Sequence, residues 1–352
     1  MMENDIEFVY LEEKDIDTPQ YISFLEKYHG QGAFKTWGVK MHWYFNSNNY
    51  RVLVAKVDGQ YAGQSTSYMA KALVRGEEKE IWWSVDTFVL EEMRGRSLGR
   101  KLQQKLHKDL PNFSSVAYAS LNGIIKKKCG AKNILDVNFK YYPISCYFSI
   151  LFEMVLRKAM RKEFTLPHIK LPNLYMNLNR WFGKGGKQLT IEEISREQIA
   201  DRASFLMEEC LKEEEFHIIR SREYLKWKYS DNPNISFKAF IVKQQGEEVG
   251  IVVLSDLYEG TYLVTKARVI KVYDFVLKKD CGVTRKQVLN RVLQHQKILW
   301  NQTPDGILAI QNIPYYPHLT YPRNREFLST LEIDKLSSGY FGYIDQDMES
   351  MS

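Results

Sequence analysis

The sequence has few cysteines, few prolines and no long apolar run. Its four cysteines lie far apart and form no CxxC pair, which argues against a disulfide framework or a zinc knuckle and favours a reducing, cytoplasmic setting. The most apolar stretch, residues 144–156, contains Ser149 and Glu153 and is shorter than the roughly 20 residues that cross a bilayer. The acidic start of the chain lacks the apolar core of a secretory signal. We therefore expect no membrane span and no secretion signal.

The excess of positive charge is modest: 49 basic and 43 acidic residues give a net charge of +6. The basic residues are spread along the chain, which indicates an anionic ligand without specifying a nucleic acid, and phosphorylated small molecules fit equally well. No His, Cys or carboxylate cluster has metal-ligand spacing, and the sequence has neither a Gly-x-Ser-x-Gly elbow nor a Walker loop. With 352 residues, the chain is long enough for two domains.

The two halves of the sequence resemble each other. In each half a segment led by a tryptophan, Trp43 or Trp227, is followed by a strand-like run and a tight turn. Each half then has a glycine and, at a nearly equal distance, an aspartate in an alternating run: Gly63 with Asp86, and Gly250 with Asp274. This self-similarity predicts two tandem α/β halves of similar fold, each a mixed β-sheet flanked by helices.

The boundary between the halves is best placed at the glycine-rich, cationic segment Gly183–Gly186. The domains would then span residues 1–183 and 184–352. The patterning of the first half predicts a strand at 6–11, helices at 19–29 and 33–45, and a strand at 81–90. The second half is expected to open with a strand at 189–191.

The sharpest local feature is residues 89–102, directly after the alternating run that contains Asp86. The leucines at 98, 102, 106 and 110 keep helical spacing, so this segment is predicted to be a strand-to-helix loop with Ser97 as N-cap. Unpaired N–H groups at a helix N-terminus bind anions, and glycines permit close approach of a diphosphate. Glycines and arginines also occur at ordinary solvent-facing turns, so physical arguments alone leave both interpretations open.

The same segment resembles motif A of the GNAT acyltransferase superfamily, which binds the pyrophosphate of coenzyme A. Six positions match, while Glu91 replaces the motif's proline and Ser97 replaces the first glycine of its G-x-G pair; the matches are Val89, Arg94, Gly95, Leu98, Gly99 and Leu102. The resemblance implies an acyl-CoA donor and no metal. It implies that the coenzyme is bound by Phe88, Val89, Arg94, Gly95, Arg96, Ser97, Leu98, Gly99, Arg100, Asn122 and Lys126.

A second segment, residues 122–131, resembles the part of GNAT proteins in which an asparagine starts a helix. The tyrosine that often protonates the departing thiolate in that family corresponds here to Lys126. The sequence leaves open whether solvent is the acid or Lys126 assists by its charge. It also leaves open whether Lys126, Lys127 and Lys128 attract coenzyme phosphates or form a solvated helix face.

The second half has no equivalent loop. After Asp274, residues 277–285 contain a single glycine and no R-G-x-G pattern. We therefore expect this half to lack its own coenzyme site and to form a wall of the acceptor cleft, since ligand sites gather between domains.

Asp86 is the candidate residue for holding or deprotonating an amine. A carboxylate in an apolar strand must be paired, protonated or exposed to a cleft. A structural hydrogen bond shared by Asp86 and Asp274 is the alternative, and Glu92 is a competitor of the same chemical type. The resemblance assigns the oxyanion donor to a backbone N–H near Val89.

The helical histidines His107 and His295 are expected at the surface, and Trp82 and Trp83 on opposite faces of their strand.

Two GNAT-like halves are similar to the two-domain N-acyltransferases of nucleotide-linked 3-amino-3,6-dideoxyhexoses. This resemblance implies transfer of an acyl group from acetyl-CoA or a short hydroxyacyl-CoA to a sugar amine, by direct attack on the thioester, in surface-polysaccharide biosynthesis. Its partners would be acyl-CoA and a nucleotide-linked amino sugar, with no nucleic acid. The alternatives are an aminoacyl or peptide N-acyltransferase and a catalytically inactive binding protein. The acyl chain, the sugar, the base and the oligomeric state are not specified by the sequence.

Overall fold

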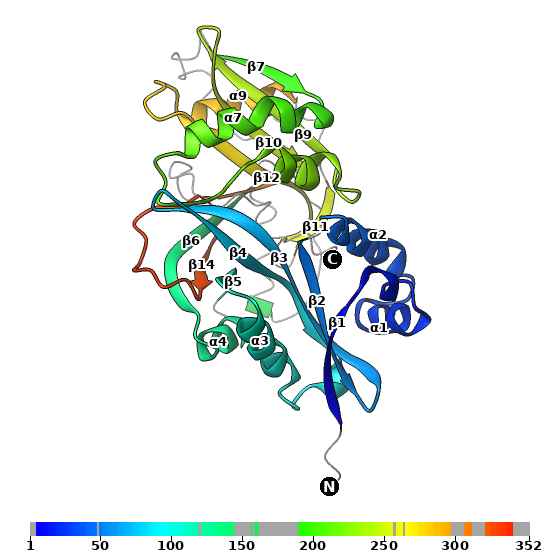
Figure 1. Cartoon of the computed structure of the whole chain (residues 1–352). Helices are drawn as coiled ribbons and strands as arrows, with labels where there is room; N and C mark the ends of the chain where they lie inside the picture. Colours follow the sequence, from blue (N-terminus) through cyan, green and yellow to red (C-terminus); the bar gives the residue numbers. More distant parts are fainter. Residues whose placement is uncertain are drawn as a thin grey trace.

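The computed structural model describes residues 5–47, 49–118, 121–143, 156, 159–160, 189–255, 258–262, 265–296, 306–311 and 321–340. Within these ranges the chain forms two similar α/β halves that share one large mixed sheet (Figure 1). The predicted boundary at residues 183–186 lies outside the described residues.

The first half follows the predicted order of elements, and its two predicted N-terminal helices are confirmed within one residue. Thr18 caps the first of them by accepting a hydrogen bond from the Tyr21 N–H, with Pro19 as its first residue. The elements of this half are β1 (Ile6–Leu11), α1 (Pro19–His29), α2 (Phe34–Phe45), β2 (Tyr50–Val57), β3 (Gln60–Val74), β4 (Glu77–Val89), α3 (Leu98–Asp109), β5 (Phe113–Tyr118), α4 (Leu121–Lys128) and β6 (Lys132–Pro143).

The second half repeats this order of strands and adds two short ones: β8, which pairs with β3 of the first half, and β11, which pairs with β12. A helical turn at Lys226–Ser230 extends α8. The elements are β7 (Leu189–Ile194), α7 (Ile199–Leu211), β8 (Phe216–Ile218), α8 (Arg222–Leu225), β9 (Phe237–Gln244), β10 (Glu247–Ser255), β11 (Tyr258–Tyr262), β12 (Thr265–Leu277), α9 (Arg285–His295), β13 (Gly306–Gln311) and β14 (Tyr321–Ser329).

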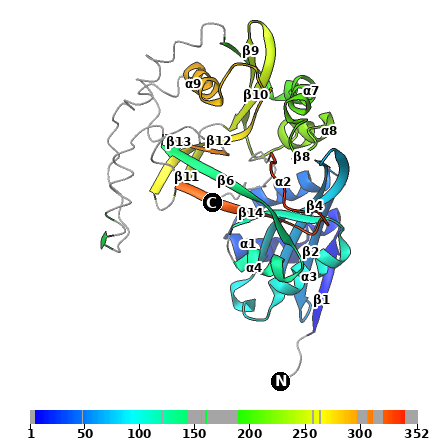
Figure 2. The ribbon, with the colours of Figure 1, turned by 90° about the vertical axis from the view of Figure 1, so that its left-hand side faces the viewer.

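The order of strands in the sheet is symmetric about its centre. It runs β1-β2-β3-β4-β5-β14-β6-β13-β12-β10-β9-β7, and each strand of one half has its counterpart at the mirrored place. At the centre, β6 and β14 lie side by side between the halves (Figure 2). β14 pairs with β5 of the first half, while β6 pairs with β13 of the second. The two halves therefore exchange their last strands.

The strand registers of the two halves agree at the repeated glycines. Gly63 lies opposite Val89 on β4, which is three residues after Asp86. Gly250 lies opposite Leu277 on β12, three residues after Asp274. A Cβ at either glycine would approach a carbonyl oxygen of the facing strand, to 3.2 Å at Gly63 and 2.3 Å at Gly250. The repeat seen in the sequence therefore corresponds to a shared register with shared close contacts.

The two repeat-related tryptophans meet where the halves touch. Their indole rings stack with centroids 5.2 Å apart. The Trp43 Nε1–H donates to the Trp227 carbonyl at 3.0 Å, and the Trp227 Nε1–H donates to the Trp43 carbonyl at 3.3 Å. Reciprocal contacts of equivalent residues are typical of a two-fold interface. The halves thus pack about an approximate two-fold axis next to this pair.

Helices cover both faces of the sheet. In the first half, α1 and α2 lie on one face and α3 and α4 on the other (Figure 1). The core under α1 and α2 continues into the second half, whereas the leucines of α3 pack on β2 and β3 in a separate cluster. Side chains of β4 can therefore point either toward α1 and α2 or toward α3.

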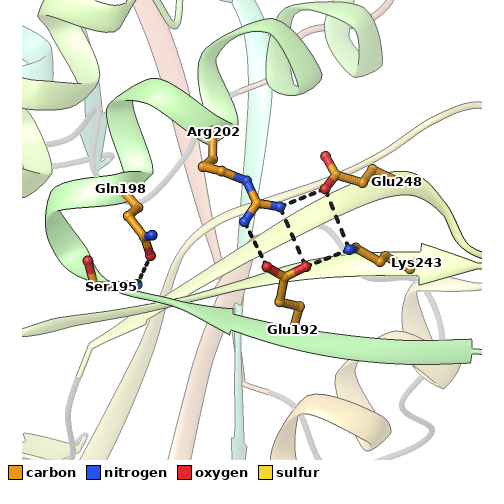
Figure 3. Close-up of polar contacts among 6 residues, drawn as sticks. All are labelled: Glu192, Ser195, Gln198, Arg202, Lys243 and Glu248. Carbon is orange, nitrogen blue, oxygen red and sulfur yellow. Dashed lines mark hydrogen bonds and ion pairs between the residues drawn. The ribbon is translucent and has the colours of Figure 1, made fainter.

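An ion-pair network ties the edge of the second half together (Figure 3). Arg202 on α7 contacts Glu192 on β7 and Glu248 on β10, each at 2.7 Å, and Lys243 on β9 contacts Glu192 at 2.6 Å. Hydrogen bonds from Arg202 and Lys243 lower the pKa of Glu192 to about 2. This contribution to stability is present above the carboxyl's ordinary pKa and is lost as the pH falls toward about 2.

Candidate functional site

The parallel strands β4 and β5 separate soon after they meet. Their pairing consists of Trp82 with Phe113 and Trp83 with Ser114. Across the other edge of β4, the register with β3 shifts between Gln64 and Thr66, so that two residues of β4 face one residue of β3. This β-bulge lies just beyond the point at which β4 and β5 diverge.

The bulge consists of Asp86 and Thr87. Asp86 has a φ of +36°, which is uncommon for a residue other than glycine. On the α3 side, the Gln103 side-chain amide donates to Ser65 Oγ at 2.8 Å and to Thr87 Oγ1 at 2.9 Å. The two hydroxyls lie 2.8 Å apart. These contacts fasten the bulge to α3.

Asp86 points to the opposite face, toward α2. Its Oδ2 accepts a hydrogen bond from Lys40 Nζ at 3.1 Å, and the Lys40 side chain is fully buried while 14% of the Asp86 side chain is exposed. The Lys40 ammonium also lies 4.6 Å from the centroid of Trp37. Asp86 is therefore a paired carboxylate next to the bulge.

His29 and Glu92 lie on the same side as Asp86 but differ in their surroundings. The ring of His29 stacks on Trp37 with centroids 4.0 Å apart, and burial lowers its pKa. Glu92, the predicted competitor of Asp86, is an exposed residue that forms an ion pair with Lys27. A hydrogen bond from Lys27 lowers the pKa of Glu92, which makes Glu92 a weaker base than a free glutamate.

The N-terminus of α3 is open. Ser97 occupies the N-cap position but has a left-handed backbone, with φ +60°, and its side chain makes no capping hydrogen bond. Ser97 therefore occupies the predicted N-cap position, but the prediction that its side chain caps the helix is wrong, because the backbone at this residue is left-handed. The first helical hydrogen bond runs from the Lys101 N–H to the Ser97 carbonyl. The N–H groups of the first turn remain available to an anion.

Gly99 lies in this first turn, in contact with β4. A Cβ at Gly99 would meet Val89 Cγ2 at 3.6 Å and nothing closer, so the protein itself does not require glycine at this position. A helical glycine costs roughly 0.5–1 kcal/mol relative to alanine. The bare backbone is therefore suited to the close approach of a ligand. Val89, at the end of β4, therefore lies next to the start of α3.

Three exposed arginines surround the open helix end: Arg94, Arg96 and Arg100. Within the described residues none of them forms an ion pair with an acidic side chain. Gly95 between them has a φ of +83°, a conformation that favours glycine. The loop therefore offers uncommitted positive charge beside free N–H groups.

The corresponding place in the second half is closed. Thr284 and Gln287 form a reciprocal capping box at the start of α9, which satisfies N–H groups that remain open in α3. A cavity of about 610 Å³ lies beside it, and two of its lysines are paired: Lys278 with Glu209 at 2.8 Å, and Lys279 with Glu213. This capped helix end therefore differs from the open N-terminus of α3.

Asp274 is held differently from its counterpart Asp86. It is fully buried, and its carboxylate accepts hydrogen bonds from Arg220 at 3.0 Å, from Tyr229 at 2.5 Å and from Tyr340 at 2.9 Å. Burial raises the pKa of Tyr229 and of Tyr340 well above its ordinary value. A buried carboxylate with three donors is a structural group, so the shared position of the two aspartates serves two different purposes.

Of the three lysines at the end of α4, Lys126 is only 4% exposed, while Lys127 pairs with Glu326 at 2.7 Å. Burial lowers the pKa of Lys126 to about 7. The solvated-face interpretation is therefore wrong for Lys126.

His107, expected at the surface, is also largely buried, and burial together with the charge of Lys126 lowers its pKa to about 4. Asn122 lies in the first turn of α4.

The burial of Lys126 predicts a particular pH dependence. In the unfolded chain the ordinary pKa is 10.5, against about 7 in the fold, so between these values the unfolded state binds more protons and stability rises with pH. Replacing Lys126→Met should raise the free energy of unfolding by a few kcal/mol at about pH 6, at roughly 1.4 kcal/mol per pKa unit. The gain should shrink toward about pH 10, which denaturant titrations would measure. Lys128→Met, on the exposed face, should show no such trend.

Lys40 and Gln103 were not among the site residues predicted from the sequence. Lys40 occupies the same helix face as the buried Trp37 and Tyr44, so a charge within an otherwise apolar stripe was the available signal. Gln103 carries the same kind of signal between Leu102 and Leu106.

Trp82 and Trp83 point to opposite faces as predicted, and Trp83 stacks on Phe327. His295 is partly exposed, near Glu193.

Among the described residues, no group of three or more His, Cys, Asp or Glu side chains could hold a metal ion. In the same residues, no helix is long and apolar enough to cross a membrane.

A cavity of about 950 Å³ lies between the halves beside Trp43 and Trp227. Neither Asp86 nor the α3 loop lines it, so it is separate from the bulge.

The structure resembles solved GNAT proteins at low sequence identity. A GCN5-related N-acetyltransferase from Kribbella flavida has a TM-score of 0.56 and 11% identity, covering 93% of this chain and 71% of that chain. A probable N-acyltransferase from Enterococcus faecalis has a TM-score of 0.58 and 7% identity, covering 98% and 75%. A tandem GNAT protein of the clavulanic acid pathway has a TM-score of 0.51 and 13% identity, covering 92% and 98%. No family model and no curated protein matches the sequence.

These similarities extend over nearly the whole chain, including both halves. The chain therefore has the tandem GNAT fold, and the prediction of two GNAT-like halves is confirmed. At these identities the likeness establishes the fold alone. The activity has to be argued from the site.

Proposed function

We propose that the protein is an N-acyltransferase that moves an acyl group from acyl-CoA to a primary amine. The open N-terminus of α3 next to the bulge of β4 carries this proposal. The residues present fit a diphosphate there: N–H groups in the first turn of α3, the bare backbone of Gly99, and three arginines, Arg94, Arg96 and Arg100, that form no ion pair within the described part of the chain. When bound, acyl-CoA supplies the thioester carbonyl that an amine attacks.

The bulge supplies the second part of the site. Within the described residues, β4 pairs with β5 only at Trp82 and Trp83, so N–H groups near Val89 can donate to the oxyanion that forms during attack. Asp86 is proposed to hold the incoming amine as its ammonium or to take its proton, with Lys40 orienting the carboxylate through their hydrogen bond. Direct attack requires no nucleophile from the protein.

As the acceptor we propose the amine of a nucleotide-linked, dTDP-type amino-deoxy sugar, with the second half as a wall of the acceptor cleft. The support is the two-domain sequence resemblance. An acceptor panel tests it: turnover of acetyl-CoA with a nucleotide-linked 3-amino-3,6-dideoxyhexose should exceed turnover with free amino sugars and with aminoacyl or peptide amines. A preference for peptide amines would replace the sugar assignment while keeping the transferase.

Calorimetric titration of coenzyme A with matched variants tests the donor site. Arg100→Ala should weaken binding by roughly tenfold or more, since a charge-assisted hydrogen bond contributes about 1.5–3 kcal/mol. Arg285→Ala, at the corresponding place in the second half, should leave the affinity nearly unchanged because that helix end is capped. A large loss with Arg285→Ala would place the donor in the other half, and no binding to the wild type would favour a different class of ligand.

A further inference from the structure

Three polar side chains form a closed set of hydrogen bonds between α3 and the bulge of β4. The amide of Gln103, which is fully buried, donates to Ser65 Oγ at 2.8 Å and to Thr87 Oγ1 at 2.9 Å. The two hydroxyls lie 2.8 Å apart, so each member contacts the other two. We call Ser65, Thr87 and Gln103 the bulge clamp. It joins β3, β4 and α3 at one point.

The corresponding strand positions of the second half hold apolar side chains. Counted from the repeated glycine and the repeated aspartate, Val252 and Phe275 occupy the places of Ser65 and Thr87. They lie directly opposite each other on β10 and β12 and are buried together with residues of α9. The register of these strands also shifts, just beyond Val252. A comparable irregularity therefore forms there with apolar packing in these two places.

The clamp is thus a polar arrangement that the fold itself does not require. Gln103 lies among the leucines of α3, and its Oε1 is buried without a hydrogen-bond partner within the described residues. Burying such an atom is unfavourable, whereas replacing all members of a hydrogen-bonded set by apolar groups of the same shape can be neutral or stabilising. The clamp occurs in the half whose helix has an open N-terminus, while the capped half has apolar side chains in its place.

The clamp lies on the same face of α3 as the proposed diphosphate site. Gly99 and Gln103 are four residues apart, so they lie one above the other on the helix, about 6 Å apart along its axis. Gly99 faces Val89 at the end of β4. Gln103 contacts Thr87, two residues earlier on the same strand. One helix therefore sets the distance between a coenzyme anchored at its first turn and the bulge of β4.

We propose that the bulge clamp positions the backbone N–H groups near Val89 as donors to the oxyanion, with Gln103 as its central positioning residue. This inference rests on the proposed function. Oxyanion donors are effective because they are fixed in advance at the place where the charge develops. The ladder of hydrogen bonds is disrupted at a bulge, so the position of this backbone depends on side-chain contacts such as those of the clamp.

Loss of the clamp should therefore lower turnover and leave coenzyme binding intact. The clamp acts on the backbone of β4, whereas the proposed diphosphate contacts come from the first turn of α3 and its arginines. An interaction that is made only in the transition state lowers kcat and kcat/KM equally. A displacement of about 1 Å in such a site can cost a hundredfold in rate.

The test compares an apolar clamp with the wild type. The triple variant Ser65→Ala, Thr87→Val and Gln103→Leu replaces all three members at once, so none of them is left without a partner. Its melting temperature should equal or exceed that of the wild type. Its turnover of acetyl-CoA with the amine preferred in the acceptor panel should fall roughly tenfold to a hundredfold, while calorimetry gives unchanged affinity for coenzyme A. Gln104→Leu, on the exposed face of α3, is the matched control and should leave turnover and affinity unchanged.

Two further readouts separate positioning from stability. The infrared band of bound acetyl-CoA, isotope-labelled at the carbonyl carbon, should lie at lower frequency in the wild type than in the triple variant, because N–H donors polarise the carbonyl. Thr87→Ser, which keeps the hydroxyl, should retain turnover, whereas Thr87→Val should lose most of it.

Wild-type turnover and an unchanged carbonyl band in the triple variant would overturn the proposal. A fall in turnover that follows the melting temperature, with no change in the band, would make the clamp purely structural and overturn it as well. If the triple variant does not fold, the two Thr87 variants decide, and equal turnover in both contradicts a positioning role. A wild type that binds no acetyl-CoA, or acylates none of the amines, would instead refute the proposed function.

Discussion

Gly99→Glu is expected to abolish coenzyme A binding while the protein stays folded. The substitution places a carboxylate in the first turn of α3, where N–H groups and three arginines would face the diphosphate. Charge repulsion and the loss of close backbone approach act together, so calorimetry should detect at least a hundredfold loss of affinity. Acidic residues are favourable in the first turn of a helix, so thermal unfolding should show no loss of stability.

Gly99→Ala is the matched control that separates the ligand from the fold. Its methyl group would make only an ordinary contact with Val89 Cγ2, at 3.6 Å, and alanine is the better helix former by up to about 1 kcal/mol. This variant should therefore melt at a higher temperature and yet bind coenzyme A more weakly than the wild type. If either Gly99 variant binds with wild-type affinity, the diphosphate does not lie at the start of α3.

Much of the fold could be predicted because the sequence repeats. The repeated glycines mark the places where a strand approaches its neighbour too closely for a side chain, and their spacing to Asp86 and Asp274 reflects the shared register. The exchange of β6 and β14 could not be predicted. Strand patterns show that a strand exists and which face is apolar, but they do not identify its neighbour, and the paired strands β5 and β14 lie more than 190 residues apart in the sequence.

The candidate site was predictable where it depends on a local turn. The glycines and arginines around α3 are contiguous, so their geometry follows from one strand-to-helix connection. The ion pair of Lys40 with Asp86 joins residues 46 positions apart, and no local pattern specifies such a contact. The open helix end was also unexpected, since Ser97 is a residue type that normally caps a helix, and the left-handed turn at this position decides otherwise.

Asp86→Asn is expected to lower turnover by roughly a hundredfold or more, the usual contribution of general acid–base help, while coenzyme A binding survives. The amide preserves the shape of the bulge but removes the charge that would hold or deprotonate the amine. It also removes the negative charge that pairs with the fully buried Lys40, and breaking a buried pair typically costs about 3–5 kcal/mol. A fall in activity could then reflect instability alone, so the single variant does not separate the two roles.

A double variant separates them. Combining Asp86→Asn with Lys40→Met removes both charges of the pair and places an apolar side chain of similar length among Trp37 and Tyr44. Replacing a buried ion pair in this way is often neutral or stabilising, so the melting temperature should return toward that of the wild type. If Asp86 acts on the amine, turnover stays about a hundredfold low although stability is restored. If turnover recovers together with stability, Asp86 serves only to neutralise Lys40. The acceptor must then lose its proton to solvent or to another group on the α1 side of the bulge, such as His29, the last residue of α1.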